Sequence, residues 1–497
     1  MAATAALAVR LGPLLQAGDV VALFGGLGAG KTAFARALIH ALQAPLGIVE
    51  EVPSPTFSLV QQYQIGQLGL WHFDLYRLAA PDETWELGLE EAFATGVSLV
   101  EWPERLGPLL PADRLEIYLE IPADAGFEDT RRCMRLVGYG SWVKRMQNEI
   151  IEFVNRAGWG GAMRTPLADD AGYRSYQRLT GAKGKAMLMN APPGGDQLRS
   201  PQAAAYNAVA HLATDCRPFV GVANHLRGLG LSAPEILAAD LTRGLLLLED
   251  LGDDLFATAI PEGADETQLY AAAIDVLLAL HAAPVPHSLT VGDGGGYLLS
   301  SYDAGAQEAE ILLLSEWYAP VVTGKALGDA ARDEYVAHWR HYFALTQPAT
   351  PVLVLRDYHA QNLFWLPQRT GIARVGLIDF QDGLLGSPAY DLVSLLEDAR
   401  RDVPPALRMH MLDRYCATAK AADRTFDDAA FRTAYAIAGA QRNCKILGIF
   451  ARLAKRDNKP AYLKLIPRVR AYLRQDLQHP AFAPLNAWFA THLPLVD

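Results

Sequence analysis

Two phosphate-binding motifs of different design lie on this one chain of 497 residues. The first motif, residues 25–32, has the pattern Gly-x-x-x-x-Gly-Lys-Thr. The second places Asp357 five residues before Asn362 and follows them with Ile-Asp-Phe at residues 378–380. A glycine-rich loop surrounds phosphates with backbone N–H groups, whereas an Asp and an Asn at the second spacing form a centre for phosphoryl transfer. No single nucleotide site uses both designs, so the sequence predicts two nucleoside-triphosphate sites in two domains.

The length and composition of the chain suit this division. At roughly 150 residues per domain the chain corresponds to about three compact units, and with 51% apolar and 20% charged residues it can build their cores. The four cysteines, at positions 133, 216, 416 and 444, have neither metal-binding nor disulfide spacing, which favours a reducing cytoplasm. Arg10 interrupts the apolar N-terminal run and no cleavage pattern follows it, so we expect no signal peptide and no membrane span.

The negative charge of the chain is concentrated near its start. Residues 1–140 hold nine Lys or Arg and seventeen Asp or Glu, a net charge of −8, against −11 for the whole chain. An acidic surface repels phosphodiester backbones. We therefore expect no direct binding of nucleic acid, and we expect this region to contact protein partners instead.

The first motif lies between a predicted strand and a predicted helix. Residues 20–24 form a short continuous apolar run, which is typical of a buried parallel strand, and residues 33–42 have the apolar spacing of a helix. Lys31 would then reach the terminal phosphates of a nucleotide, and Thr32 would offer its hydroxyl to Mg²⁺. The expected nucleotide-binding residues of this loop are Gly25, Gly28, Ala29, Gly30, Lys31 and Thr32.

Two acidic residues follow predicted strands in the same segment. Residues 70–73 and 97–100 have strand character and lead into Asp74 and Glu101 respectively. Carboxylates at strand ends beside a phosphate-binding loop can hold a metal ion or orient a water molecule. One such acid alone is more often simply solvated, but two of them after this loop favour a function. We predict that both carboxylates take part in catalysis and in Mg²⁺ binding.

Three further motifs, at residues 54–60, 72–78 and 100–106, resemble the bacterial TsaE family, the small ATPase of tRNA threonylcarbamoyladenosine biosynthesis. The resemblance spans roughly residues 5–140. It implies that this domain binds ATP and works with TsaD-like and TsaB-like proteins rather than modifying tRNA alone.

The same resemblance implies roles for particular residues. It places Thr56 in a switch-like loop and Trp102 in the region of the nucleotide pocket. It places Asp74 and Glu101 in the metal and water network. The family usually has an acidic residue at the position of Gly26, and this departure puts ATP hydrolysis, more than ATP binding, in question.

A second domain is predicted to begin near residue 142, where an amphipathic helical pattern follows the last strand of the first domain. The later patterns predict strands at residues 173–179, 185–190 and 245–248, with a helix near residues 219–229. This order suits the small lobe of a kinase-like fold, with a hinge at which backbone groups of Glu249 and Leu251 bind adenine. Residues 170–175 could form a loop over the phosphates, although by themselves they are only a turn signal.

The strongest signal of the second domain follows a predicted strand at residues 352–355. Asp357 would accept the proton of an attacking hydroxyl, while Asn362 and Asp379 would hold Mg²⁺ against the phosphates. Each of these residues alone is more often a turn-forming Asp or Asn, but the set with its strands favours a kinase centre. Asp391 is predicted to cap a helix rather than to bind substrate.

Residues 145–490 resemble the aminoglycoside phosphotransferase-like superfamily. Within it, residues 187–193, 248–253 and 356–362 are most similar to the AmgK-type sugar kinases. The resemblance implies a bilobal kinase that uses ATP and phosphorylates the anomeric hydroxyl of N-acetylmuramate and N-acetylglucosamine in peptidoglycan recycling.

One residue of the second domain departs from the general kinase plan. Met189 stands where the small lobe of a kinase has its phosphate-binding lysine, and the following helix offers no acid to pair with such a lysine. The nearby cations Lys183, Lys185 and Arg174 are all candidates to replace it.

The sequence therefore predicts an α/β chain with a P-loop NTPase domain at residues 1–141 and a bilobal protein-kinase-like α+β domain at residues 142–497. The small lobe is expected at about residues 142–250 and the large lobe at about residues 251–497. ATP and Mg²⁺ are the expected cofactors, and an amino sugar is the expected substrate. Two alternatives stay open: a phosphotransferase for aminoglycosides or other small molecules, and a first domain that is a non-hydrolysing ATP-binding scaffold.

Overall fold

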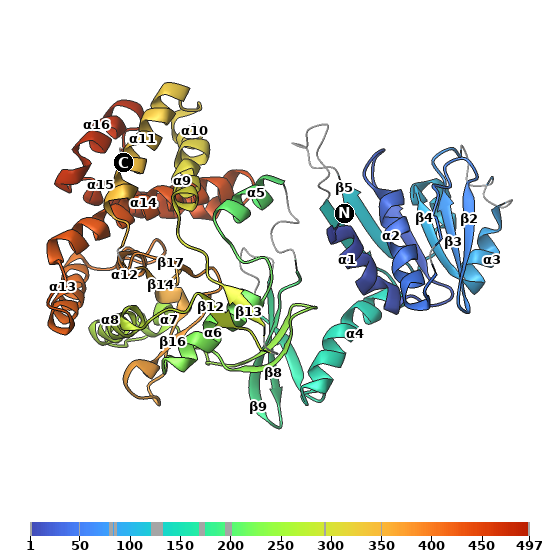
Figure 1. Cartoon of the computed structure of the whole chain (residues 1–497), viewed down its shortest axis with the longest axis horizontal. Coiled ribbons are helices and arrows are strands. Elements are labelled where there is room, and N and C mark those ends of the chain that lie inside the picture. Colours follow the sequence, from blue (N-terminus) through green and yellow to red (C-terminus); the bar gives the residue numbers. More distant parts are fainter. Residues whose placement is uncertain are drawn as a thin grey trace. The chain divides into compact units, whose positions relative to one another are not determined.

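The computed structural model describes residues 2–48, 50–78, 83, 87–120, 133–167, 174–193, 201–292, 295–348 and 350–495. The chain divides into two compact units (Figure 1). The first comprises residues 1–161 and 194–205, and the second comprises residues 162–193 and 206–497. Most of the predicted loop at residues 170–175 lies outside the described residues.

The first unit is an α/β fold around a six-stranded sheet with the strand order β2-β3-β4-β1-β5-β6. The four inner strands are parallel, and β2 and β6 add antiparallel edges. One face of the sheet packs against α1, α2 and the start of α4, and the other packs against α3. The elements are α1 (Ala2–Leu11), β1 (Val20–Phe24), α2 (Lys31–Gln43), β2 (Val60–Ile65), β3 (Leu68–Asp74), α3 (Leu89–Thr95), β4 (Val97–Glu101), β5 (Leu115–Glu120), β6 (Cys133–Gly138) and α4 (Ser141–Arg156). The carboxyl ends of β1, β3 and β4 therefore meet at one edge, where α/β folds bind ligands.

Helix α4 packs on the first unit. Trp142 is fully buried in the apolar cluster that α1 and α2 share with the sheet. Arg145 donates two hydrogen bonds of 2.5 Å to the carboxylate of Asp19. The two compact units of the structure divide after residue 161, whereas the sequence predicted a domain boundary after residue 141. A sequence pattern shows that a helix is amphipathic but not which unit its apolar side meets, so the end of the first independently folding domain stays a prediction.

We expect a fragment of residues 1–161 to be about 3–5 kcal/mol more stable than a fragment of residues 1–141, because the shorter one lacks the buried indole of Trp142. We also expect residues 162–497 to fold without residues 1–161. Denaturant unfolding of the three fragments measures both expectations. Equal free energies of unfolding for the two shorter fragments would show that α4 does not stabilise the first unit.

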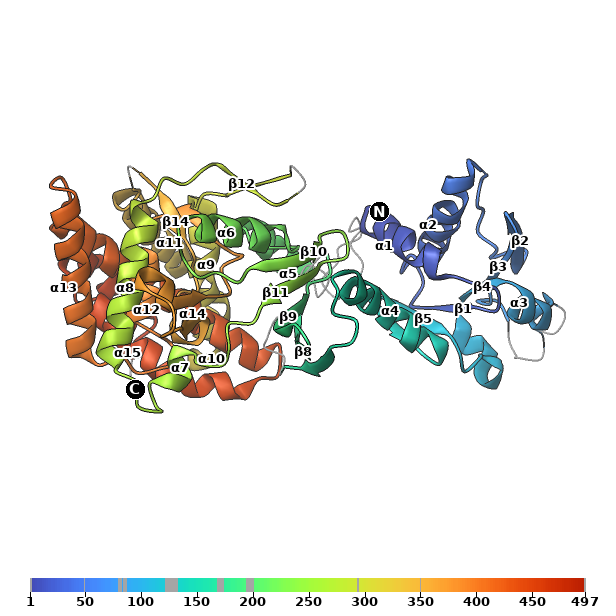
Figure 2. The same ribbon diagram turned by 90° about the horizontal axis from the view of Figure 1, so that it is seen from below.

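The second unit begins with a smaller lobe built on an antiparallel sheet with the order β10-β11-β9-β8-β7 (Figure 2). Its elements are β7 (Met163–Pro166), β8 (Ser175–Gly181), β9 (Gly184–Asn190), α6 (Arg217–Gly228), β10 (Ile236–Asp240) and β11 (Leu245–Glu249). Helix α5 (Pro201–Val209) is divided, because residues 201–205 belong to the first unit and residues 206–209 to the second. The strands and the helix predicted from the sequence correspond to β8, β9, β11 and α6. The structure adds β7 and β10, at the two edges of the sheet.

The larger lobe is mostly helical and has two apolar cores. One core surrounds α8 and α12 and continues into β9, β11 and α6 of the smaller lobe. The other joins α11, α14, α15 and α16, near the C-terminus in Figure 1. The ribbons β14–β17 and β15–β16 carry the predicted catalytic segment. The elements are α7 (Phe256–Ala259), α8 (Glu266–Ala282), β12 (Ser288–Thr290), β13 (Gly296–Leu298), α9 (Ala304–Leu313), α10 (Ala319–Thr323), α11 (Asp329–Leu345), β14 (Val352–Val354), β15 (Leu363–Trp365), β16 (Val375–Leu377), β17 (Leu384–Gly386), α12 (Ala389–Leu396), α13 (Pro405–Ala422), α14 (Asp428–Lys455), α15 (Ile466–Asp476) and α16 (Ala483–His492). Among the described residues, none of the helices has the length and apolar character needed to span a membrane.

Candidate functional site

The first candidate site is the loop between β1 and α2, where the sequence predicted a phosphate-binding turn. Gly25 has a φ of 144°, and a Cβ there would overlap the carbonyl oxygen of Leu119. Gly30, with a φ of 100°, directly precedes the first residue of α2. Only glycine adopts this backbone easily. The tight turn lets the N-terminus of α2 face the loop, and helix N-termini bind phosphates through their N–H groups.

Lys31 lies folded over this loop. Its Nζ donates to the carbonyl oxygens of Gly25 at 2.6 Å and Gly26 at 2.9 Å, and it lies 3.7 Å from the centroid of the Trp102 ring. Burial lowers the pKa of Lys31, although the nearby carboxylates, first among them Glu101, raise it. Phosphate oxygens are stronger partners for an ammonium group than carbonyls or an aromatic ring. The lysine is therefore positioned to exchange these contacts for a nucleotide.

The predicted acidic residues meet the loop from two neighbouring strands. Glu101 ends β4, and its Oε2 accepts a hydrogen bond of 2.9 Å from Thr32 Oγ1. Asp74 ends β3 and lies beside Glu101 in the parallel register. The buried His72 holds Glu101 from the other side, with 2.8 Å between Nε2 and Oε1. Sequence reasoning gave His72 no role, although its place two residues before Asp74 puts both side chains on one face of β3.

Thr56 completes this group. Its Oγ1 donates to Asp74 Oδ2 at 2.5 Å and lies 2.8 Å from the hydroxyl of Ser54. The structure thus brings together the predicted residues Thr32, Thr56, Asp74 and Glu101. Two carboxylates and a hydroxyl suit Mg²⁺, which binds one or two carboxylates and completes its shell with phosphate and water oxygens. In the part of the chain that the structure describes, no group of three or more His, Cys, Asp or Glu side chains is arranged to hold a metal ion.

The second candidate site is formed by residues that follow β14 and β16 in the chain. Asn362 Nδ2 donates to the backbone carbonyl of Asp357 at 2.9 Å and to Asp379 Oδ2 at 3.3 Å. Gln381 Nε2 donates to the other oxygen of Asp379 at 2.8 Å. Asn362 is therefore in direct contact with Asp379 and with the backbone of Asp357, the two other residues predicted to form the catalytic centre. One carboxylate and one amide oxygen again suit a Mg²⁺ ion that also binds phosphates.

The two aspartates of this centre have different electrostatic surroundings. Burial raises the pKa of Asp357, but the positive charges of Lys445 and Arg442 outweigh this effect and lower the pKa below its usual range. Burial raises the pKa of Asp379, against the attraction of Arg174. Asp357 is therefore ionised at neutral pH, as an acceptor of a substrate proton must be.

Asp391 supports the catalytic loop, and the prediction that it caps a helix is wrong. It is fully buried in the first turn of α12 and forms no cap there. Its two oxygens accept the backbone N–H groups of Leu355 at 2.6 Å and Arg356 at 2.9 Å. Burial raises the pKa of Asp391 to about 7, although these N–H groups lower it. The partners lie 36 and 35 residues earlier in the chain, outside any local pattern.

A buried charge cluster holds the same loop. Glu310 pairs with Arg356, and its Oε1 lies 2.7 Å from Lys445 Nζ. Its other oxygen accepts hydrogen bonds from Gln441 and Tyr302. Burial alone would raise the pKa of Glu310, but Lys445 and Arg356 lower it to about 2. The cluster fixes Arg356, which has a φ of 68° and directly precedes Asp357.

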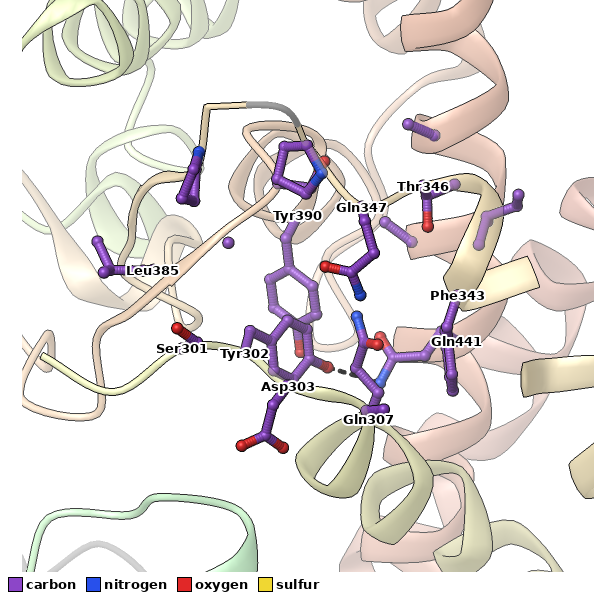
Figure 3. A pocket seen from close by; sticks show the side chains of 18 residues that line it. Ser301, Tyr302, Asp303, Gln307, Phe343, Thr346, Gln347, Leu385, Tyr390 and Gln441 are labelled. Atoms are coloured by element: carbon purple, nitrogen blue, oxygen red, sulfur yellow. Dashed lines mark hydrogen bonds between the residues drawn. The ribbon is translucent and has the colours of Figure 1, made fainter. Parts of the chain in front are cut away.

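Side chains of this cluster also line a cavity of about 280 Å³ (Figure 3). Tyr302, Gln307 and Gln441 lie close together in this view, with Tyr390 behind them. The predicted catalytic residues Asp357, Asn362 and Asp379 do not line the cavity. We therefore assign it to neither site.

The predicted hinge follows β11. The backbone N–H of Glu249 donates to the carbonyl of Glu235 at 2.9 Å, and its carboxylate pairs with Arg369. Because the protein itself engages the N–H of Glu249, this group is not the adenine donor in this conformation. Adenine binding by other backbone groups of Glu249 and Leu251 stays a prediction.

Comparison with known proteins assigns the N-terminal and C-terminal parts of the chain to two different families. Residues 1–132 match the family of the threonylcarbamoyl adenosine biosynthesis protein TsaE, and residues 164–428 match the phosphotransferase enzyme family. An N-acetylmuramate/N-acetylglucosamine kinase of Caulobacter vibrioides is 44% identical over 69% of this chain and 95% of its own. A tRNA threonylcarbamoyladenosine biosynthesis protein TsaE of Treponema pallidum is 43% identical over 24% of this chain and 86% of its own. A crystal structure of a choline/ethanolamine kinase family protein from Mesorhizobium loti is 15% identical over 70% of this chain and 98% of its own, with a TM-score of 0.42.

Proposed function

Because the chain belongs to the TsaE family in its N-terminal part and to the phosphotransferase enzyme family in its C-terminal part, we propose that it carries two ATP-dependent activities. The C-terminal part is a kinase. We assign it the transfer of the ATP γ-phosphate to the anomeric hydroxyl of N-acetylmuramate or N-acetylglucosamine in cell-wall recycling. The relatives named for these two sugars support this choice of substrate.

The contacts of Asn362 with Asp379 and with the backbone of Asp357 carry the kinase proposal. Asp357 accepts the proton of the sugar hydroxyl while the hydroxyl oxygen attacks the γ-phosphorus of ATP, and ADP leaves. Asn362 and Asp379 would hold Mg²⁺, which neutralises the charge of the phosphates when bound. Asp391 holds the backbone of Leu355 and Arg356 next to the proton acceptor. Glu310 holds the side chain of Arg356.

A panel of acceptors tests this proposal. The full chain is incubated with ATP and Mg²⁺ and either N-acetylmuramate, N-acetylglucosamine, the corresponding 1-O-methyl glycosides, or aminoglycosides. We expect a sugar 1-phosphate, identified by NMR and mass, from the two free sugars and none from the glycosides, whose anomeric oxygen is blocked. Phosphorylation of the aminoglycosides alone would favour the alternative substrate class.

For the N-terminal part we propose an ATPase that supports tRNA threonylcarbamoyladenosine modification together with TsaD-like and TsaB-like proteins. The grouping of Lys31, Thr32 and Glu101 around the phosphate loop supports ATP binding. Thr32 and the two strand-end carboxylates, Asp74 and Glu101, would hold Mg²⁺ there. The acidic surface supports a protein partner over direct contact with tRNA.

We expect Lys31→Ala in the fragment of residues 1–161 to weaken ATP binding by about 10–100-fold, because it removes a charge-assisted contact to phosphate. Calorimetric titration with ATP and Mg²⁺ measures this loss. Lys144→Ala, which removes an exposed lysine of α4, is the matched control and should leave the affinity unchanged. Equal affinities of the native fragment and Lys31→Ala would show that the loop does not bind the nucleotide.

The native fragment should hydrolyse ATP slowly until TsaD-like and TsaB-like proteins are added. Gly26 stands where the family has an acid, and a Cβ at this position meets no atom within 4 Å. Gly26→Asp is therefore expected to fold and to hydrolyse ATP faster than the native fragment, as measured by phosphate release. Rapid hydrolysis by the native fragment without partners would contradict the proposed role of this position.

A further inference from the structure

Kinases bind the phosphates of ATP with a lysine on a strand of the small lobe. From the sequence we expect this position to be taken by Met189 of β9, which is 1% exposed and lies in an apolar cluster that both lobes share. Phe219 and Val222 of α6 belong to the same cluster. A thioether in an apolar core cannot bind phosphate, so another cation must supply the charge.

The strand register identifies a cation near Met189. Met189 lies opposite Tyr176 in the antiparallel pair of β8 and β9. Arg174, two residues before Tyr176, directly precedes Ser175, the first residue of β8, and Ser175 pairs with Asn190, which follows Met189 in β9.

The side chain of Arg174 extends to the catalytic centre of the larger lobe. Its Nη2 lies 3.5 Å from Oδ1 of Asp379, and the two side chains are 17% and 39% exposed. Asp379 is the carboxylate proposed to hold Mg²⁺ beside the phosphates. A guanidinium group at this place can meet phosphate oxygens with two parallel N–H donors.

The two lysines of the same hairpin lie toward its turn, away from Met189. Lys185 pairs with Thr180, four residues from Met189 along β9, which corresponds to about 13 Å at 3.3 Å per residue. Lys183 lies in the turn between Gly181 and Gly184, and both lysines are exposed. Of the three candidates from the sequence, Arg174 alone contacts a residue of the catalytic centre.

We propose that Arg174 binds the phosphate groups of ATP in the kinase site and replaces the small-lobe lysine of other kinases. The proposal rests on the kinase function proposed above. Without a nucleotide, the guanidinium pairs with Asp379. When ATP binds, the more highly charged phosphate oxygens become its partners.

ATP binding to the full chain tests this proposal without a sugar. All proteins carry Lys31→Ala, so that the kinase site dominates the titration, and each is titrated with ATP and with adenosine by calorimetry in the presence of Mg²⁺. Arg174→Ala should weaken ATP binding by about 10–100-fold and leave adenosine binding unchanged, because adenosine has no phosphate. Arg174→Lys should recover part of the affinity, and Lys185→Ala should have no effect.

The same titrations contain the results that would overturn the proposal. An unchanged ATP affinity in Arg174→Ala would show that Arg174 does not bind phosphate. An equal loss for ATP and adenosine would show that it only shapes the site. If the native chain phosphorylated none of the N-acetylated sugars, the proposed substrate would be wrong, but the ratio of the ATP and adenosine affinities would still decide the role of Arg174.

Discussion

Replacing Asp357 by Asn should lower the turnover number for sugar phosphorylation by about 10²–10⁴-fold, the range expected for a lost general base. An amide has the same size as the carboxylate but cannot accept the hydroxyl proton. ATP binding should change little, because the backbone of Asp357 makes the contacts that shape the loop: its carbonyl accepts hydrogen bonds from Asn362 Nδ2 at 2.9 Å and from the N–H of His359 at 3.1 Å. Steady-state kinetics and calorimetry with ATP distinguish the two effects.

Two further variants complete this experiment. Asp275→Asn makes the same chemical change at an exposed carboxylate that pairs with Arg414, and it should leave turnover unchanged. Asp379→Ala should instead raise the Mg²⁺ concentration that ATP binding requires, because it removes a proposed metal ligand. If Asp357→Asn turned over at the native rate, the proton acceptor would have to be another group. An unchanged Mg²⁺ dependence in Asp379→Ala would remove the metal role of that residue.

The parts of both sites that could be predicted are those in which a short segment carries the chemistry. The turn at residues 25–32 needs glycines at fixed places between a strand and a helix, and residues 357–362 need an Asp and an Asn at a fixed spacing. Asp74 and Glu101 could be added because parallel strands end at the same edge of a sheet. In each case the pattern is local, and the fold then brings the patterns together.

The residues that support the catalytic loop could not be predicted in this way. Asp391 and Glu310 lie 35 and 46 residues from their partner Arg356. Glu308 and Glu310 are both acids of α9, yet the first pairs with an arginine at the surface and the second is fully buried. Only the tertiary packing around the helix distinguishes them, since a charge is buried only where partners compensate its loss of solvation.

Replacing Glu310 by Gln should destabilise the protein by about 3–5 kcal/mol, the cost expected when one member of a buried ion pair is removed. Arg356 and Lys445 both pair with this carboxylate, and their side chains are 2% and 13% exposed. Glutamine keeps the shape of the side chain but removes the negative charge with which both buried cations pair. The free energy of unfolding in denaturant measures the effect.

Glu308→Gln, in the same helix, is the matched control. Glu308 pairs with Arg340, and the two side chains are 28% and 65% exposed. Solvent-exposed ion pairs contribute at most about 1 kcal/mol. We therefore expect the control to cost much less than Glu310→Gln, although both changes remove one carboxylate from α9. Equal costs for the two variants would show that burial of the cluster has no special energetic role.

The pH dependence of this loss of stability distinguishes the contribution of the Glu310 charge from the contribution of the side chain's shape. The pKa of Glu310 is about 2 in the folded protein, against an ordinary value of 4.5. A group whose pKa is lowered by folding stabilises the folded state fully above its unfolded pKa, and this contribution is lost as the pH falls through the folded pKa. The difference in unfolding free energy between the native protein and Glu310→Gln should therefore be constant from about pH 6 to 7 and shrink below about pH 4.5. A difference that stays constant down to acidic pH would show that Glu310 stabilises the loop through packing and neutral hydrogen bonds instead of its charge.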